Sequence, residues 1–292
     1  MTTSLSQRVL PVAVMAVAVI AVWYGGAVWL NAPQAMEAMA RAGKNWSTAD
    51  LVMQTFAMKR PVLPTPDQVV VEIYHSLTDY PIGHIRNLLY HTGVTSASAL
   101  VGFVMGVVLG VVLAIGIVHV RTLEASLLPW IIASQTIPIL AIAPMIVVIL
   151  GNLGFTGLLP KAVISMYLCF FPITVGMVKG LRSVDGMAQD LMRTYNASAR
   201  QVFWMLRLPS AVPYLFTSLK VAIAISLVGA IVGELPTGGQ AGLGSRLLSG
   251  SYYGQTVQIW SALVMSAVLS VVLIAVVGLA EKLVGRHTGA HP

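Results

Sequence analysis

Residues 190–209 read DLMRTYNASARQVFWMLRLP, a polar and basic stretch in a chain that is otherwise strongly apolar. Of the 292 residues, 57% are hydrophobic and 9% are charged, and the mean hydropathy is +0.84. Soluble globular domains carry about 25% charged residues, so this composition excludes that class. The sequence therefore predicts an all-α polytopic membrane protein in which residues 190–209 connect two spans.

The charge of the chain is explained better by membrane topology than by a polyanionic partner. The formal net charge is +7 and the isoelectric point is near 9.7. The basic residues are scattered among apolar runs and do not gather on one solvated face, so nucleic acid is not an expected partner. The one cysteine, Cys169, lies in an apolar run, which excludes an intrachain disulfide and a cysteine-based metal cluster.

Six apolar runs are long enough to cross a bilayer, which takes about 20 residues for roughly 30 Å of hydrocarbon. We expect these spans at residues 9–30, 94–118, 125–150, 158–178, 214–235 and 257–280. The first run is longer than the core of a signal peptide, so residues 1–30 are predicted to form an uncleaved anchor helix. Cleavage after Asn31-Ala32 is the alternative.

Lysine and arginine in short loops predict the orientation, because they accumulate on the cytoplasmic side. If the N-terminus is inside, the inner segments hold most of these residues, and the short outer loops hold Lys161 and Arg246. We therefore predict that both termini are cytoplasmic. The expected organisation is an anchor helix at 1–30, an outer segment at 31–93, a five-helix core at 94–281 and a cytoplasmic tail at 282–292.

The outer segment is predicted to contain a helix that lies at the membrane interface. Residues 61–66 form a proline-rich turn, and residues 67–78 place apolar side chains on one side of a helix. His75, His84 and His91 lack the spacing of zinc ligands, so no metal site is predicted.

Small residues and prolines indicate tight helix packing in the core. Glycines recur at intervals of four from Gly102 to Gly110, which lets another helix approach the second span closely. Small residues recur in the same way in the fifth span from Ser218 through Ser226 to Ala230, and the next position in the series is Glu234. Prolines interrupt the third and fourth spans, and such kinks survive where neighbouring groups satisfy the released carbonyls.

The inner loop at residues 179–213 is far longer than the turn that two antiparallel helices need. Residues 184–195 and 197–206 can form two short helices, and Asn196 between them suits a left-handed C-cap. The second helix would either dock into a groove on another protein or rest on lipid headgroups, and composition alone favours neither.

The spacing of residues in this loop resembles a known pattern. The pattern begins with Asp190, Leu191 and Met192. Three residues separate Met192 from Asn196, and nine separate Asn196 from Leu206-Arg207-Leu208-Pro209. This resembles the E-A-A, G and I-x-L-P loop of the permease subunits of ATP-binding-cassette (ABC) importers. Asn196-Ala197-Ser198 resembles the Gly-Ala-Ser of the branch that moves taurine, alkanesulfonates, nitrate or pyrimidine precursors of thiamine. Further matches are Leu63-Pro64-Thr65-Pro66, Ile137-Pro138, Ala143-Pro144, Phe171-Pro172-Ile173, Gly233-Glu234 and Ala241-Gly242-Leu243-Gly244.

The resemblance implies a type I (MetI-like) importer permease, a bundle of six transmembrane helices that pairs with an identical or related permease subunit in the bacterial inner membrane. A periplasmic binding protein would deliver a small polar solute, and separate ATPase subunits would bind ATP and Mg. Membrane lipid would surround the spans. The coupling residues that the resemblance implies are Asp190, Leu191, Met192, Arg193, Asn196, Ala197, Ser198, Phe203, Leu206, Arg207, Leu208 and Pro209.

The sequence lacks the G-x-x-x-x-G-K-[ST] motif of an ATPase, so the chain is predicted to be a transport subunit with no cofactor of its own, and not an enzyme. An ATP-independent carrier or channel is the alternative. It predicts inverted repeats, and the two halves show no convincing symmetry.

Polar residues inside the spans are candidates for lining or gating a pathway. They are Ser134, Gln135, Thr136, Pro138, Ser165, Tyr167, Ser226 and Glu234. The hydroxyl and amide groups would alternatively bond to backbone released by the prolines, and Glu234 would alternatively cap the glycine-rich turn at 238–244. Lys220 is expected to extend to the headgroups. The substrate is expected to be a pyrimidine-like heterocycle or a sulfonate- or nitrate-type anion. Fixed positive charge along the path would help an anion, and Lys220 is the one candidate for it, so the aromatic and hydroxyl lining suits a neutral heterocycle better.

Overall fold

A computed structural model of the chain describes residues 5–43, 46–236 and 241–288, and every regular element among them is a helix. The structure divides into two units. Unit 1 holds the residues up to Leu89 together with Arg246–Val264, and unit 2 holds Tyr90–Ser245 together with the residues from Met265 onward. The predicted all-α class is confirmed.

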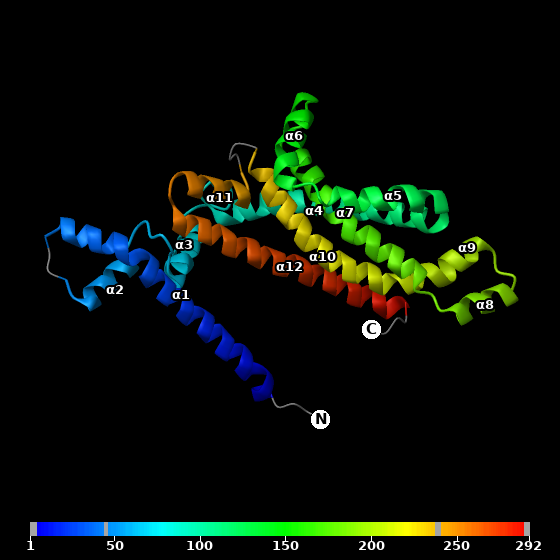
Figure 1. Ribbon diagram of the computed structural model, residues 1–292, viewed down its shortest axis with the longest axis horizontal. Coiled ribbons are helices and arrows are strands. Elements are labelled where there is room, and N and C mark those ends of the chain that lie inside the picture. The colour runs from blue at the N-terminus through cyan, green and yellow to red at the C-terminus, as the bar shows by residue number, and fades with distance from the viewer. Residues whose placement is uncertain (1–4, 44–45, 237–240, 289–292) are drawn as a thin grey trace. The chain divides into compact units, whose positions relative to one another are not determined.

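Five long helices and one bent helix pair, among the described residues, are apolar enough to cross a membrane. The long helices are α1 (Leu5–Arg41), α4 (Leu88–His119), α7 (Leu158–Arg182), α10 (Leu208–Glu234) and α12 (Thr256–Thr288), as Figure 1 shows. The bent pair is α5 (Arg121–Ser134) with α6 (Ile139–Asn152). Each predicted span therefore corresponds to one of these six apolar segments.

The third predicted span, residues 125–150, is not one helix. α5 ends at Ser134, α6 begins at Ile139, and the two helices are bent by 100° (Figure 1). Pro138 accounts for the break, because it has no N–H for an intrahelical bond and disfavours the helical conformation of the residue before it. The expected kink is therefore a sharp turn between two short helices.

In unit 1, the buried side chain of Asn31 ties α1 to the segment that precedes α3 (Pro66–Thr78). Its oxygen accepts hydrogen bonds from the N–H groups of Val62 (2.7 Å) and Leu63 (3.2 Å). Its amide nitrogen donates to the carbonyl of Leu63 at 2.8 Å. These bonds satisfy the buried amide of Asn31. The helix continues past residue 30, the predicted end of the first span, and reaches Arg41.

The helix predicted at 67–78 is confirmed as α3, whose N-cap is Thr65. Gln68 fixes the start of this helix against the end of α2 (Thr48–Phe56). Its oxygen accepts from the N–H of Thr65 at 3.1 Å, and its nitrogen donates to the carbonyls of Phe56 (2.7 Å) and Met58 (3.1 Å). The interfacial location of α3 stays a prediction.

In unit 2, α4 and α10 pack against α7 at glycines. A Cβ atom on Gly102 would overlap the side chain of Ser165, and one on Gly106 would overlap that of Cys169. A Cβ atom on Gly229 of α10 would lie 2.7 Å from the Cα of Ser165. The small-residue series predicted in the second span therefore forms the surface of α4 that contacts α7.

Candidate functional site

The loop between α7 and α10 contains the helix α8 (Gly186–Thr194), which ends in a left-handed turn at Asn196. Asn196 has φ +52°, and its N–H donates to the carbonyl of Arg193 at 2.9 Å. The next N–H, from Ala197, donates to the carbonyl of Met192 at 3.0 Å. These two bonds form a Schellman motif. The predicted left-handed C-cap at Asn196 is therefore confirmed.

The second short helix predicted at 197–206 is wrong in its extent. α9 (Ala199–Val202) continues through a π-helical turn, η1 (Phe203–Arg207), into α10. In η1 the N–H of Leu208 donates to the carbonyl five residues earlier. This wider turn carries the helix past Pro209, which has no N–H to donate. α9 is consequently the first turn of the long helix that contains the fifth span.

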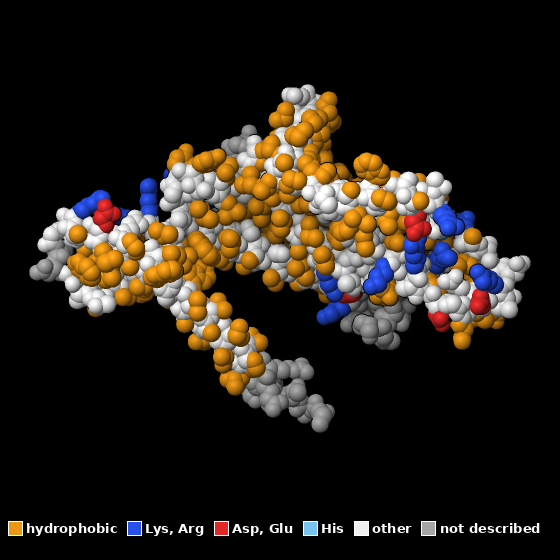
Figure 2. All heavy atoms as spheres, in the orientation of Figure 1, with side chains coloured by type: hydrophobic (Ala, Val, Ile, Leu, Met, Phe, Trp, Pro, Cys, Tyr) orange, Lys and Arg blue, Asp and Glu red, His pale blue; other side chains and the backbone are white. Residues whose placement is uncertain are grey.

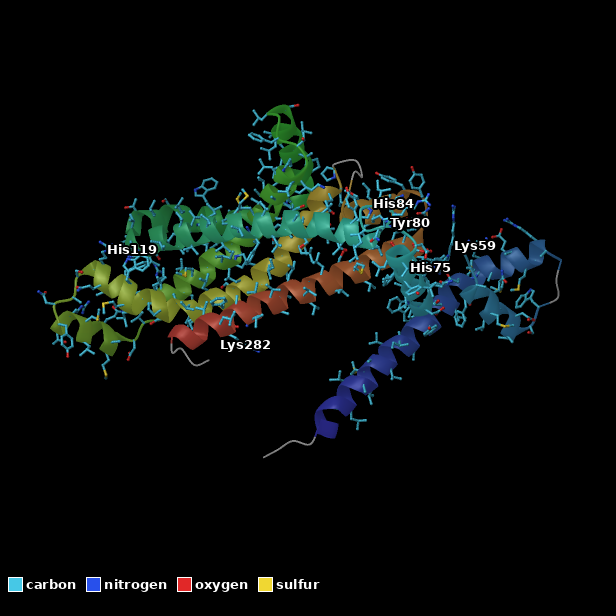
Figure 3. The ribbon with its side chains drawn as sticks, turned by 180° about the vertical axis from the view of Figure 1, so that it is seen from behind. Lys59, His75, Tyr80, His84, His119 and Lys282 are labelled. Atoms are coloured by element: carbon cyan, nitrogen blue, oxygen red, sulfur yellow. The ribbon has the colours of Figure 1, made fainter. Side chains whose placement is uncertain are left out.

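The start of this long helix is fixed by its own cap and by a ring contact. Ser198 and Gln201 form a capping box, in which Gln201 Oε1 accepts from the Ser198 N–H at 2.8 Å. The ring of Phe203 lies edge-on to that of His119 at the end of α4, with 5.2 Å between centroids. Figure 3 shows His119 beside this part of the chain. The backbone of the loop is thereby held in one conformation.

Large apolar side chains of the loop are exposed on the surface of the chain. Met187 and Tyr195, near the two ends of α8, are 80% and 78% exposed, and Leu191 between them is 56% exposed. In η1, Trp204 is 58% and Met205 is 69% exposed. Figure 2 shows charged side chains gathered over the same end of unit 2. An apolar patch rimmed by charge is typical of a surface that binds another protein.

The predicted coupling residues divide into an exposed and a half-buried group. The exposed residues are Asp190, Leu191, Arg193, Asn196, Ser198 and Pro209. The half-buried residues are Met192, Ala197, Phe203, Leu206, Arg207 and Leu208. Asp190 and Arg193 form an ion pair of 3.0 Å, but both side chains are more than 70% exposed, so the pair adds little stability. It leaves both charges accessible to a partner.

Four exposed apolar residues were not predicted as coupling residues: Met187, Tyr195, Trp204 and Met205. The importer pattern has no position for them. The available signal is their residue type, because a large apolar side chain in a polar loop needs a partner. The sequence also does not reveal that Phe203 turns inward while its neighbour Trp204 turns outward.

Glu234, at the end of α10, is fully buried and accepts a hydrogen bond at each carboxylate oxygen. Thr95 Oγ1 donates to Oε1 at 2.8 Å, and the N–H of Gly244 donates to Oε2 at 2.7 Å. The Thr95 oxygen in turn accepts from the N–H of Leu243 at 2.8 Å. Because Leu243 and Gly244 begin α11 (Leu243–Tyr252), Glu234 and Thr95 accept hydrogen bonds from the first N–H groups of this helix and cap it.

The turn before α11 makes further contacts in the same cluster. Gly242 has φ +123°, and a Cβ atom there would overlap the carboxyl group of Glu234. Its N–H donates to Nδ1 of His91 at 3.0 Å, and Lys161 Nζ donates to the carbonyl of Ala241 at 3.2 Å. The rest of the predicted glycine-rich turn, 238–240, lies outside the described residues. These contacts are those of a capping residue, and a gating role for Glu234 stays a prediction.

The predicted pathway residues Ser165 and Ser226 lie within helix packing. Both are fully buried. Ser165 Oγ donates to the carbonyl of Ser226 at 3.0 Å, and Ser226 Oγ donates to the carbonyl of Ala99 at 2.6 Å. The two hydroxyls therefore join α4, α7 and α10 to one another.

The remaining pathway candidates gather at the break before Pro138. Ser134 Oγ donates to the carbonyl of Ile131 at 2.7 Å, and Thr136 Oγ1 donates to that of Ala133 at 2.8 Å. The hydroxyl of Tyr167 donates to the carbonyl of Ser134, and Gln135 Nε2 donates to the Ser134 hydroxyl at 3.2 Å. Most of these bonds satisfy backbone groups released at the end of α5, as the alternative interpretation expects.

Lys220 on α10 forms an ion pair with α12. Its Nζ pairs with Oε2 of Glu281 on α12 at 2.5 Å. The pair gives Lys220 a partner within the protein, and its contact with headgroups stays a prediction. Among the described residues, no three His, Cys, Asp or Glu side chains are grouped to hold a metal ion.

Comparison with known proteins gives consistent matches. Residues 106–289 match the family model described as "Binding-protein-dependent transport system inner membrane component". The chain is 30% identical over 212 residues to a probable ABC transporter permease protein of Haemophilus influenzae, covering 73% of this chain and 81% of that protein. It is 32% identical over 226 residues to the riboflavin transport system permease protein RibX of Chloroflexus aurantiacus, covering 77% and 80%. It is 32% identical over 184 residues to the formylaminopyrimidine transport permease protein ThiX of Halalkalibacterium halodurans, covering 63% and 68%.

The family match spans more than half of the chain and includes α7, α8 and the whole of α10. The predicted resemblance to importer permeases is therefore confirmed. The prediction that the chain is a multi-pass membrane protein is also confirmed. The chain belongs to the binding-protein-dependent transport system inner membrane components, the permease subunits of ABC importers.

Proposed function

We propose that this chain, paired with a second identical or related permease subunit, forms the pathway of an ABC importer, and that separate ATPase subunits drive it through residues 190–209. The observation that carries the proposal is the apolar surface of α8 and η1, which the chain leaves exposed: Met187, Leu191, Tyr195, Trp204 and Met205. The Schellman turn at Asn196 holds α8 and η1 in a fixed arrangement, so the surface is organised before a partner binds.

The continuity of α9, η1 and α10 supports a mechanism of coupling. Ala199–Glu234 is one apolar helical segment of 36 residues, so a displacement of its first turn acts on the whole span. The far end of this helix carries Glu234, whose carboxylate caps α11 through the N–H of Gly244. Closure of two ATPases around nucleotide would therefore tilt α10 as a rigid lever and move the start of α11 with it.

The division of labour follows from the family. ATP and Mg would bind to the ATPase subunits, and this chain would be a transport subunit without an ATPase site of its own. The assembly would lie in the inner membrane with both termini of this chain in the cytoplasm, and a periplasmic binding protein would deliver the solute.

A small nitrogen heterocycle is the proposed solute. Two relatives are named for riboflavin and formylaminopyrimidine, which are both nitrogen heterocycles. Lys220 was the candidate for fixed positive charge in the spans, and Glu281 neutralises it. An anion such as a sulfonate or nitrate therefore gains no attraction from that lysine.

Co-purification with the ATPases encoded beside this chain tests the proposal. We expect the wild-type chain to recover its ATPase, and Asp190→Arg or Asn196→Val to reduce recovery at least roughly tenfold, since each alters the exposed loop. Glu37→Arg is the matched control, because Glu37 is also an exposed acid in a local ion pair, with Arg41 at 2.6 Å.

Recovery of no ATPase by the wild-type chain, or equal recovery by the Asp190, Asn196 and Glu37 variants, would contradict the proposal. The solute is tested separately on the binding protein encoded nearby. A nitrogen heterocycle should raise its melting temperature, whereas stabilisation by sulfonate or nitrate alone would reject the proposed solute class.

A further inference from the structure

Unit 1 contains a polar cavity of about 450 Å³, which is the size of many small-molecule sites. The walls come from the segments before and after α3, from α3 itself, from α11 and from the start of α12. Its charged lining residues are Lys59, Arg60, Arg86, Arg246, Glu72 and Asp79. Four basic and two acidic side chains leave an excess of positive charge, even with His75 neutral.

Neither acid forms an ion pair with the lysine and arginine residues of the cavity. Asp79 Oδ2 contacts His75 Nδ1 at 3.0 Å, and its other oxygen accepts from the hydroxyl of Thr78 at 3.1 Å. Among the described residues, no carboxylate lies within 4.0 Å of the nitrogens of Arg86, Arg246 or the two other cations. The positive charges of the cavity are therefore available to an added anion.

Arg246 is half-buried and held by an amide. With the Gln258 amide turned to satisfy its neighbours, its oxygen accepts from Nε and Nη2 of Arg246 at 2.9 Å. Burial lowers the pKa of the Arg246 guanidinium from its ordinary value. The charge of Glu72 raises this pKa, and the charge of Arg86 lowers it. The net lowering means that Glu72 does not fully offset the burial of this positive charge, which an added anion would stabilise.

Arg86 is positioned by aromatic rings. Its Nη1 donates to the hydroxyl of Tyr80 at 3.3 Å, and its Cζ lies 5.7 Å from the centre of that ring. The Tyr80 ring stacks on His84 with 5.1 Å between centroids. Figure 3 shows Tyr80, His84 and His75 close to one another, with Lys59 on the neighbouring segment. The guanidinium is thus preorganised before any ligand binds.

We propose that this cavity binds a phosphate-type oxyanion, with Arg246 and Arg86 as its charge-assisted donors. A guanidinium presents a planar fork of N–H groups that can bind two oxygens of one phosphate. A chloride ion is a single sphere and has no such pair of acceptor atoms. The phosphate would come either from a free anion or from a lipid headgroup. The proposal rests on unit 1 alone and does not depend on the transport function proposed above.

Thermal unfolding of the purified full chain in detergent tests the binding chemistry. We expect inorganic phosphate to raise the melting temperature above that in chloride at equal ionic strength. Arg246→Gln and Arg86→Gln should each weaken the apparent affinity at least roughly tenfold, since each removes charge-assisted hydrogen bonds. Arg41→Gln is the control, because Arg41 is an exposed arginine of unit 1 that does not line the cavity. If Arg246→Gln fails to fold, the exposed Arg86 decides the test.

Lipid discs distinguish the two sources. A headgroup is the source if two results are obtained. Adding phosphatidylglycerol to phosphatidylcholine discs abolishes the effect of phosphate on the melting temperature. In native mass spectrometry, the wild-type protein retains phosphatidylglycerol and the Arg86→Gln variant does not. A free anion is the source if phosphate still raises the melting temperature in those discs. The proposal is overturned if phosphate and chloride act alike and no phosphatidylglycerol is retained, or if Arg86→Gln responds as the wild type does.

Discussion

Two polar interruptions of this apolar chain differ in how their side chains are satisfied. Around Glu234, each carboxylate oxygen accepts a hydrogen bond and the residue is fully buried. In α8 and η1 the backbone is equally well capped, but Trp204 and Met205 remain exposed. The comparison teaches that a buried, satisfied group stabilises the fold, whereas an organised but uncovered surface indicates binding to another molecule. Mutations should therefore affect stability at the first region and partner binding at the second.

Gly242→Ala should have the largest effect on stability. The substitution places a side chain at φ +123° and into the Glu234 carboxyl group. Backbone strain and the overlap together should cost at least about 3 kcal/mol of unfolding free energy. We expect a large drop in melting temperature, or loss of the folded peak in size-exclusion chromatography.

Gly43→Ala is the control for strain alone. Gly43 has φ +62°, and a Cβ atom there would meet nothing within 4 Å. Its cost should be about 1–2 kcal/mol. If Gly242→Ala were no worse than Gly43→Ala, the Glu234 cluster would be loose rather than closely packed, and the comparison would fail.

Thr95→Val should destabilise the same cluster by about 2–3 kcal/mol. It keeps the shape of the side chain but removes the donor to Glu234 and the acceptor for the Leu243 N–H. Thr95→Ser, which keeps the hydroxyl, should lose much less. Equal melting temperatures for the two variants would show that these hydrogen bonds contribute nothing measurable.

The Lys220–Glu281 pair should show a smaller, coupled effect. Lys220→Met leaves the Glu281 carboxylate without its ion-pair partner. Glu281→Gln likewise leaves the Lys220 ammonium group without an ion-pair partner. The double variant should be less destabilised than the sum of the two, by about 1–2 kcal/mol. Melting temperatures of all four proteins complete the cycle, and strictly additive losses would show that the ion pair is weak.

Features that depend on local chemistry were predictable from the sequence. Hydropathy located the six apolar segments, because a bilayer imposes their length. Asn196 was predicted as the left-handed residue because its short polar side chain tolerates that conformation. The glycines of α4 were predicted as a contact surface, since their spacing places them on one stripe of a helix.

Features that depend on tertiary neighbours were not predictable. The 100° break at Pro138 is stabilised by the hydroxyl of Tyr167, which comes from another helix. The ion pair of Lys220 with Glu281 was not predicted, because the sequence does not show that the two residues lie side by side. At the candidate site, Trp204 is exposed within a π-helical turn, and the periodicity of the sequence does not indicate such a turn.

Trp204→Ser and Met205→Ser should have the smallest effect on stability and a large effect on partner binding. Both side chains are mostly exposed, so the unfolding free energy should change by no more than about 0.5 kcal/mol. Recovery of the ATPase should fall at least roughly tenfold, because large apolar side chains dominate the energy of protein interfaces. Trp130→Ser on α5 is the matched control, since Trp130 is 77% exposed but lies outside the loop. If Trp130→Ser reduced recovery as much as Trp204→Ser, exposure of a tryptophan would not by itself indicate where the ATPase binds. A selective loss with Trp204→Ser and Met205→Ser would instead locate the binding surface on η1.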